Sequence, residues 1–176
     1  MSQTMTAELT QEDARRARIL EGATAVFLSY GFQRTTMEDI ARAAEVSRPA
    51  LYLLFRNKTD IYRALAGEFL KKFLAEAETA IAGEGSLAAR LERAVECSLC
   101  EMRQIEEFPH GAEILDMRSS LAADIVADGR GRMQAIFEKA IAAEAARRGR
   151  ADADPALLAG LALDALDGLH MRNPPL

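Results

Sequence analysis

Thr35–Phe55, TTMEDIARAAEVSRPALYLLF, contains two short helical patterns separated by a three-residue break. At the start of the first pattern, the Thr36 side chain can accept the backbone N–H of Asp39, and the Asp39 carboxylate can accept the N–H of Thr36 in return. Ser47 can cap the second helix, and Pro49 falls in its first turn, where a missing N–H costs nothing. The stretch therefore predicts two short capped helices joined by a tight turn.

The second short helix has two different faces. Its inward face is apolar and comprises Leu51, Leu54 and Phe55. Its outward face carries the side chains that a recognition helix would offer to the major groove of DNA, namely Arg48, Pro49, Ala50, Tyr52 and Leu53.

The outward residues suggest specific contacts. Arg48 can grip the two acceptors of a guanine edge or contact a phosphate, and both roles stay open. Tyr52 can reach a phosphate oxygen or pack against the first predicted helix, at about residues 11–30. Ala50 and Leu53 can supply only apolar contacts, for instance to thymine methyl groups.

The ordered string from Ala23 to Ile61 resembles the N-terminal domain of TetR-family transcriptional repressors. It includes FxxxGFxxTTMxDIAxxAxVSxxxLYxxFxxKxxI from Phe27 onward and covers about the first third of the chain. The string departs from the family where the turn glycine is replaced by Glu45 and where Leu53 and Leu54 follow the tyrosine.

The resemblance implies that Tyr52 contacts the DNA backbone. It also implies that Thr36 and Lys58 hold phosphates, which agrees with their places at the starts of two helices, where the helix dipole attracts anions. Thr36 would act through its backbone N–H and Lys58 through its charge. Arg15, Arg16 and Arg18 would extend the contact or lie on an ordinary solvated helix face.

Charge is distributed unevenly along the 176 residues. Residues 1–75 hold 11 Lys+Arg and 9 Asp+Glu, and residues 76–176 hold 11 and 18, so the two parts carry +2 and −7. A basic front surface suits phosphate, and an acidic back part should point away from DNA. A value of +2 is also compatible with an ordinary helical surface.

The sequence contains no uninterrupted apolar run of the roughly 18 residues that a membrane helix requires, and its first residues lack an apolar signal core. We therefore expect a cytoplasmic protein without a membrane partner. Cys97 and Cys100 lie three residues apart in a helical pattern, without two further ligands nearby for zinc. Ordinary helix residues are the favoured interpretation over a redox or metal switch, and we expect no metal and no cofactor.

Helical periodicity continues along the whole chain, and no segment alternates as a strand would. Besides the two short helices, we expect helices at about 11–30, 58–83, 87–105, 112–117, 121–147 and 155–171. The predicted fold is all-α: a three-helix DNA-binding domain at residues 1–57, a connecting helix at 58–83 and a helical effector-binding and dimerisation domain at 84–176.

The resemblance also implies a dimer and an effector. Family members usually have two helices near the C-terminus that form a four-helix bundle with a second subunit. Only one is evident here, so we expect a shortened member or a truncated product. Flexible apolar residues and two arginines in the back part could line a pocket for an anionic effector, although methionines at helical spacing are more often core: Met102, Arg103, Phe108, Met117, Arg118, Met133 and Phe137.

These observations predict a ligand-responsive repressor that binds a palindromic operator as a homodimer. The alternative is a helical binding protein that has the same fold but has lost operator recognition. An enzyme is not expected, because the histidines are far apart and neither a nucleophile elbow nor a glycine-rich phosphate loop is present.

Overall fold

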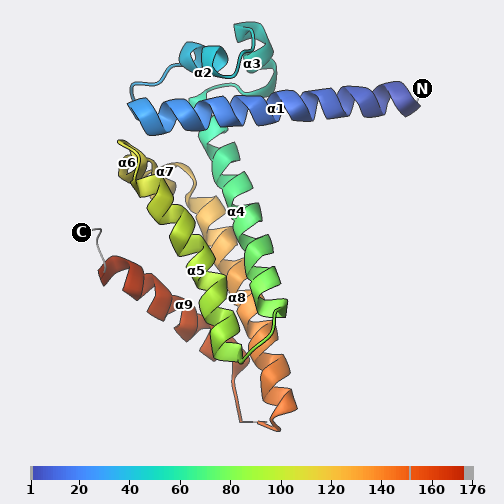
Figure 1. Ribbon diagram of the computed structural model, residues 1–176, viewed down its shortest axis with the longest axis vertical. Helices are drawn as coiled ribbons and strands as arrows, with labels where there is room; N and C mark the ends of the chain where they lie inside the picture. The colour runs from blue at the N-terminus through green and yellow to red at the C-terminus, as the bar shows by residue number, and fades with distance from the viewer. Residues whose placement is uncertain (1, 151, 173–176) are drawn as a thin grey trace. The chain divides into compact units, whose positions relative to one another are not determined.

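The computed structural model describes residues 2–150 and 152–172, and the side chains of residues 11–96, 100–150 and 152–165. Throughout these residues the regular structure is helical and contains no strand, which confirms the all-α prediction (Figure 1). The helices are α1 (Ser2–Tyr30), α2 (Met37–Ala43), α3 (Arg48–Leu54), α4 (Lys58–Ala82), α5 (Leu87–Glu106), α6 (Gly111–Asp116), α7 (Arg118–Leu121), α8 (Ala123–Arg147) and α9 (Pro155–Arg172).

The helix positions follow the predicted ranges, except that α1 begins earlier and that a separate short helix, α7, lies between α6 and α8. Helix α1 begins at Ser2, earlier than the predicted Gln11, because residues 2–10 lack the apolar stripe by which a packed helix is identified in sequence. Helix α8 runs without a break through Gly129, where a Cβ atom would lie 2.5 Å from Leu70 Cδ1. Glycine at this position therefore permits the close packing of α8 on α4.

The chain packs as two units. The first comprises the described residues up to Phe69 together with Met102–Ile125, and the second comprises Leu70–Glu101 together with the described residues from Val126 onward. None of the helices in the described residues combines the length and apolarity needed to cross a membrane.

The core of the first unit lies between α1, α2, α3 and the start of α4. Phe27, Ile40 and Leu51 are fully buried there, one from each of the first three helices. Phe32 joins them, with its ring centroid 5.2 Å from that of Phe27 and 5.8 Å from that of Tyr62. Such aromatic pairs add stability beyond the burial of their area. This core holds α2 and α3 against α1 (Figure 1).

Residues 102–125 join the first unit through polar contacts with α4. The Tyr62 hydroxyl donates to the Ile114 carbonyl at 2.7 Å, and burial raises the pKa of Tyr62 to about 12. Arg63 bonds both Asp124 and the Leu121 carbonyl. The domain ranges expected from the sequence had placed residues 102–125 with the C-terminal part, since no local pattern reveals contacts between residues more than 50 positions apart.

The second unit packs α4, α5, α8 and α9 around a separate apolar core. Its buried members are Leu74, Ala77, Ala94, Met133, Phe137, Ile141, Ala159 and Leu163.

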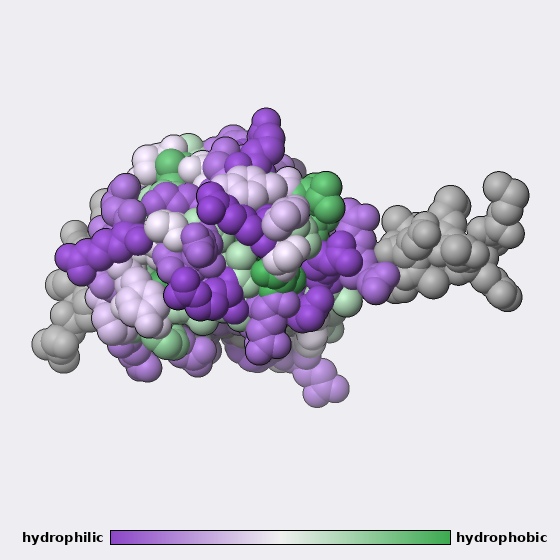
Figure 2. Space-filling view, turned by 90° about the horizontal axis from the view of Figure 1, so that it is seen from above, coloured by the Kyte–Doolittle hydropathy of each residue, from purple (hydrophilic) through white to green (hydrophobic). Residues whose placement is uncertain are grey.

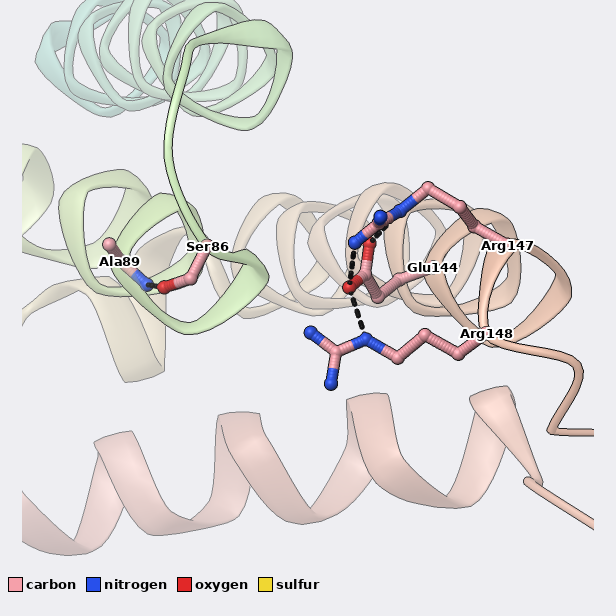
Figure 3. Close-up of polar contacts among 5 residues, drawn as sticks. All are labelled: Ser86, Ala89, Glu144, Arg147 and Arg148. Atoms are coloured by element: carbon pink, nitrogen blue, oxygen red, sulfur yellow. Dashed lines mark hydrogen bonds and ion pairs between the residues drawn. The ribbon is translucent and has the colours of Figure 1, made fainter.

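Charged and capping contacts surround this second core. Glu144, near the end of α8, accepts hydrogen bonds from Arg147 and Arg148 (Figure 3), and these bonds lower the pKa of its carboxyl to about 2. The same figure shows the start of α5, where Ser86 Oγ accepts the N–H of Ala89 at 3.2 Å.

Candidate nucleic-acid interface

The start of α2 is fixed by the predicted capping box. Thr36 Oγ1 accepts the Asp39 N–H at 3.2 Å, and Asp39 Oδ2 accepts the Thr36 N–H at 2.9 Å and the Thr36 hydroxyl at 2.6 Å. Hydrogen bonds from the Thr36 side chain and backbone lower the pKa of Asp39. The capping box thus occupies the Thr36 N–H that the sequence analysis had assigned to a phosphate. Helix geometry leaves the N–H groups of Met37 and Glu38 without intrahelical partners.

The turn between α2 and α3 contains the left-handed residue expected from the sequence. Glu45 has φ 53, and the Val46 N–H donates to the Ala41 carbonyl at 3.0 Å, which closes the end of α2. A non-glycine residue in this conformation costs roughly 1 kcal/mol. Burial of Ala41 and Ala44 between the helices offsets this strain.

Helix α3 begins as predicted. Ser47 is the N-cap, and its Oγ accepts the Ala50 N–H at 3.3 Å, while Pro49 occupies the first turn. Leu51 and Phe55 are buried beneath the helix. The cap and the buried side fix which residues of α3 face outward.

The outward face of α3 carries exposed residues of several chemical types. The Arg48 side chain is 60% exposed, and Tyr52 and Leu53 are 43% and 80% exposed. Pro49 is also exposed, and Ala50 is half-buried. Figure 2 shows the face of the first unit that carries α2 and α3, where hydrophilic side chains surround small hydrophobic areas. This face offers a cation, a phenol and an apolar side chain on one rigid helix.

The Arg48 guanidinium lies near two other side chains, those of Glu38 and Tyr52. Its Nη1 lies 3.7 Å from Glu38 Oε2, and its Cζ lies 5.8 Å from the centroid of the Tyr52 ring. Both ionic side chains are well exposed, so the ion pair contributes little to stability. Glu38 was not among the residues predicted from the sequence, although its place one residue before Asp39 in the first turn of α2 indicated an exposed position.

The Lys58 ammonium is hydrogen-bonded within the chain. Its Nζ donates to the carbonyl oxygens of Phe32 at 2.7 Å, Gln33 at 3.1 Å and Thr35 at 3.1 Å. It also lies 4.5 Å from the centroid of the Phe32 ring. The expected phosphate role of the side chain therefore competes with three internal acceptors, which no local sequence pattern identifies.

Residues 19–65, which include α2, α3 and the start of α4, match the family described as bacterial regulatory proteins, tetR family. The match spans the capped helices, the left-handed turn and the exposed face of α3. The chain belongs to the TetR family.

Curated relatives and solved structures agree with this assignment. The chain is 30% identical to the uncharacterised HTH-type regulator YhgD of Bacillus subtilis over 57% of this chain and 54% of that protein. It is 32% identical to the HTH-type regulator HbdR of Aromatoleum sp. over 74% of this chain and 58% of that protein. The chain thus spans a little over half the length of these relatives.

A structural comparison extends over more of the chain. SmeT, the repressor of the Stenotrophomonas maltophilia multidrug efflux pump SmeDEF, aligns in its triclosan complex with a TM-score of 0.63 and 25% identity. This alignment covers 90% of the present chain and 81% of SmeT. The TetR-family fold therefore includes the helices that follow α4.

The N-terminal arginines differ in their surroundings in this TetR-family chain. The Arg16 guanidinium lies over the Phe55 ring at 4.9 Å from its centroid, so it helps to cover the end of α3. Arg15 is half-buried and Arg18 is exposed on α1. Of these three arginines, Arg18 is therefore the most accessible to a phosphate of bound DNA.

The residues predicted to bind an effector are divided between the two units. Met102, Arg103, Phe108, Met117 and Arg118 belong to the first unit, and Met133 and Phe137 are buried in the core of the second. Within the first unit, Arg118 Nη1 lies 3.4 Å from Met102 Sδ, and its Nε donates to the Leu115 carbonyl at 3.0 Å. Arg103 and Phe108 are exposed.

Met133 and Phe137 are 3% and 0% exposed among apolar neighbours. Both residues are therefore part of the core, which is the alternative that the sequence left open for the methionines. Only Met102 and Arg118 of the predicted set are in direct polar contact.

Metal-binding residue types are dispersed. Among the residues whose side chains are described, no three His, Cys, Asp or Glu side chains gather closely enough to hold a metal ion. Cys100 is exposed, whereas the side chains of Cys97 and His170 lie outside the described residues. His110 Nδ1 lies 3.1 Å from Glu113 Oε2, at the start of α6.

Proposed function

We propose that this TetR-family chain is a sequence-specific DNA-binding transcriptional regulator whose α3 enters the major groove. The observation that carries the proposal is the exposed face of Arg48, Tyr52 and Leu53 on a helix fixed by its own cap and buried side. A helix-turn-helix protein contacts base edges with the first residues of its second helix. Because its partner would be chromosomal DNA, we place the chain in the cytoplasm.

Each outward residue has a distinct proposed role. Arg48 would contact a guanine edge or a phosphate after leaving Glu38, and Tyr52 would donate its hydroxyl to a phosphate oxygen. Ala50 and Leu53 would supply apolar contacts to thymine methyl groups, next to Pro49 in the first turn. Arg48 therefore contributes the most to base preference in this proposal.

Phosphates on either side of the groove would bind at the starts of α2 and α4. First-turn N–H groups point along the helix axis and attract anions. In α2 these are the groups that follow Thr36, whose own N–H is used by Asp39. In α4, Asn57 Oδ1 accepts the Asp60 N–H at 2.9 Å, which leaves the N–H groups of Lys58 and Thr59 for a phosphate.

A homodimer is part of the proposal because one helix-turn-helix module reads too few base pairs for useful specificity in a genome. Two copies related by two-fold symmetry would read a palindrome with half-sites spaced by about 10 base pairs or a multiple of that. Helix α9 supports pairing, since Leu157, Leu158 and Leu161 are 59%, 44% and 55% exposed. Exposed apolar side chains at this spacing suit a helix–helix interface.

We further propose that a small-molecule effector lowers DNA affinity and that the chain acts as a repressor. The likeness to SmeT, a pump repressor solved with triclosan, supports both points. Arg118 and Met102 offer a cation and a polarisable thioether to such a ligand. The effector must bind the two conformations with different affinities, and the difference sets the shift that it can produce.

The test is selection of bound duplexes from a random pool by the purified chain, with its mass in solution measured alongside. We expect a palindromic sequence bound by a dimer, with affinity that falls steeply as salt rises. The alternative function is a helical interaction protein of the same fold that has lost operator binding. It predicts that no sequence is enriched, and that outcome would reject the proposal.

A further inference from the structure

The Lys58 ammonium is saturated by hydrogen bonds within the protein. An ammonium has three N–H donors, and Lys58 directs them to three carbonyls, those of Phe32, Gln33 and Thr35. Its Nζ also lies over the Phe32 ring, which is itself buried. The charge is therefore compensated by oriented dipoles and by an aromatic face without any external anion.

The three carbonyls belong to the turn that leads from α1 into α2. Thr35 also stabilises this turn, because its buried hydroxyl donates to the Gly31 carbonyl at 2.7 Å. The next residue, Thr36, is the N-cap of α2. Lys58, the first residue of α4, thus binds the turn that directly precedes the start of α2.

We propose that Lys58 is a positioning residue of the DNA-binding surface and that its ammonium does not contact a phosphate. It fixes the start of α2 relative to the start of α4, so that the first-turn N–H groups of both helices and the face of α3 meet the duplex together. This inference rests on the proposed DNA-binding function. It departs from the phosphate role that the position of Lys58 suggested from the sequence.

Two substitutions separate positioning from phosphate contact. Lys58→Arg keeps the positive charge and would still serve a phosphate, but a planar guanidinium cannot place one nitrogen among three converging carbonyls. Lys58→Met keeps the apolar stem over Phe32 and removes the charge. A positioning role predicts that both variants lose affinity, whereas a phosphate contact predicts that only Lys58→Met does.

The DNA experiment uses a duplex selected by the wild-type chain and a scrambled duplex of equal length, titrated at several salt concentrations. We expect each variant to bind the selected duplex roughly tenfold more weakly, the scale of one charge-assisted hydrogen bond. Binding to the scrambled duplex should change little. The slope of log K against log salt should stay at the wild-type value, because no phosphate contact is lost.

Lys71→Met is the matched control, since it removes one exposed lysine charge from the same helix. Its affinity for the selected duplex should equal that of the wild type. A wild-type affinity for Lys58→Arg, together with a slope reduced by about 0.9 per lost contact for Lys58→Met, would overturn the inference. A variant that is only less stable would keep wild-type affinity at temperatures where it is folded, and that result would also overturn it.

A second measurement needs no DNA, so it separates this inference from the proposed function. Lys58 is one of four lysines in the chain, and limited acetylation followed by mass spectrometry reports the reactivity of each. We expect Lys58 to react at least about tenfold more slowly than the exposed Lys139, because the Lys58 nitrogen is held by three acceptors. Equal reactivity would reject the internal clamp, whereas failure of duplex selection alone would reject the proposed function.

Discussion

Arg63 and Asp124 form a bidentate ion pair, with Nη1 2.7 Å from Oδ1 and Nη2 2.6 Å from Oδ2. Arg63 Nη1 also donates to the Leu121 carbonyl at 2.8 Å. The pair joins the early part of α4 to the first turn of α8 within the first unit. It therefore connects α4, the helix that follows α3, to a residue 61 positions further along the chain.

This ion pair should make stability depend on pH. Hydrogen bonds from Arg63, followed by its charge, lower the pKa of Asp124 to about 2, below its ordinary value of 3.8. Because the pKa is lower in the folded state, the stabilisation is complete above the unfolded value and is lost as pH falls from 3.8 toward 2. We expect Asp124→Asn to lower the melting temperature at pH 7, with a difference that shrinks below pH 3.8. Thermal melts across this range test it, with Asp128→Asn, an exposed i,i+4 pair member, as the control.

Replacement of Arg48 and Tyr52 by alanine should abolish binding to the selected duplex. Both side chains are exposed, so their loss should leave the helical content and the melting temperature near the wild-type values. Fluorescence anisotropy and circular dichroism measure the two properties. Unchanged affinity would remove α3 as the recognition surface, and a loss of helicity would show that the two residues hold the fold.

Substitution of Glu38 by glutamine should strengthen DNA binding a few-fold. The carboxylate holds Arg48 at 3.7 Å and would repel nearby phosphates, and glutamine removes the charge with little change of shape. Titration of the same duplex with both proteins measures the effect. Glu92→Gln, an exposed site on α5 in the second unit, should leave affinity unchanged. Weaker binding by Glu38→Gln would mean that the carboxylate itself serves recognition.

Glu45→Gly should stabilise the chain. Glu45 has φ 53, where a side chain adds strain that glycine lacks, although glycine loses more freedom on folding. The net gain should be below about 1 kcal/mol in the free energy of unfolding by urea. Glu45→Ala keeps the Cβ atom and should show no such gain. A loss of stability in Glu45→Gly would indicate that the glutamate side chain has a stabilising contact.

Two helical glycines should respond in opposite directions to alanine. At Gly22, on α1, an added Cβ would lie 2.7 Å from the Ala44 backbone nitrogen, so Gly22→Ala should cost on the order of 1–3 kcal/mol. At Gly67, on α4, an added Cβ meets nothing within 4 Å. Gly67→Ala should therefore add about 0.5–1 kcal/mol by helix propensity. Urea unfolding measures the change in the free energy of unfolding for both variants. Equal changes would contradict the packing of α1 on the end of α2.

The features that the sequence determined are those whose atoms lie within about four residues of one another. The Thr36–Asp39 capping box and the Ser47 cap depend on local backbone geometry, and each lies at the residues predicted from the sequence. The left-handed Glu45 lies where the family resemblance implies a turn glycine. The two faces of α3 follow in the same way from a fixed helical period. The motif around these features also resembles the TetR family by its residues alone.

Tertiary structure alone decided the contacts between distant segments. Lys58 finds its carbonyls 23 to 26 positions away, Arg63 finds Asp124 61 positions away, and Met133 and Phe137 are core residues of a different unit from Met102 and Arg118. Helical periodicity fixes which face of a helix is apolar, but it does not specify which other helix covers that face. A lysine at a helix start therefore has the same sequence signature whether it binds a phosphate or donates hydrogen bonds to three carbonyls of its own chain.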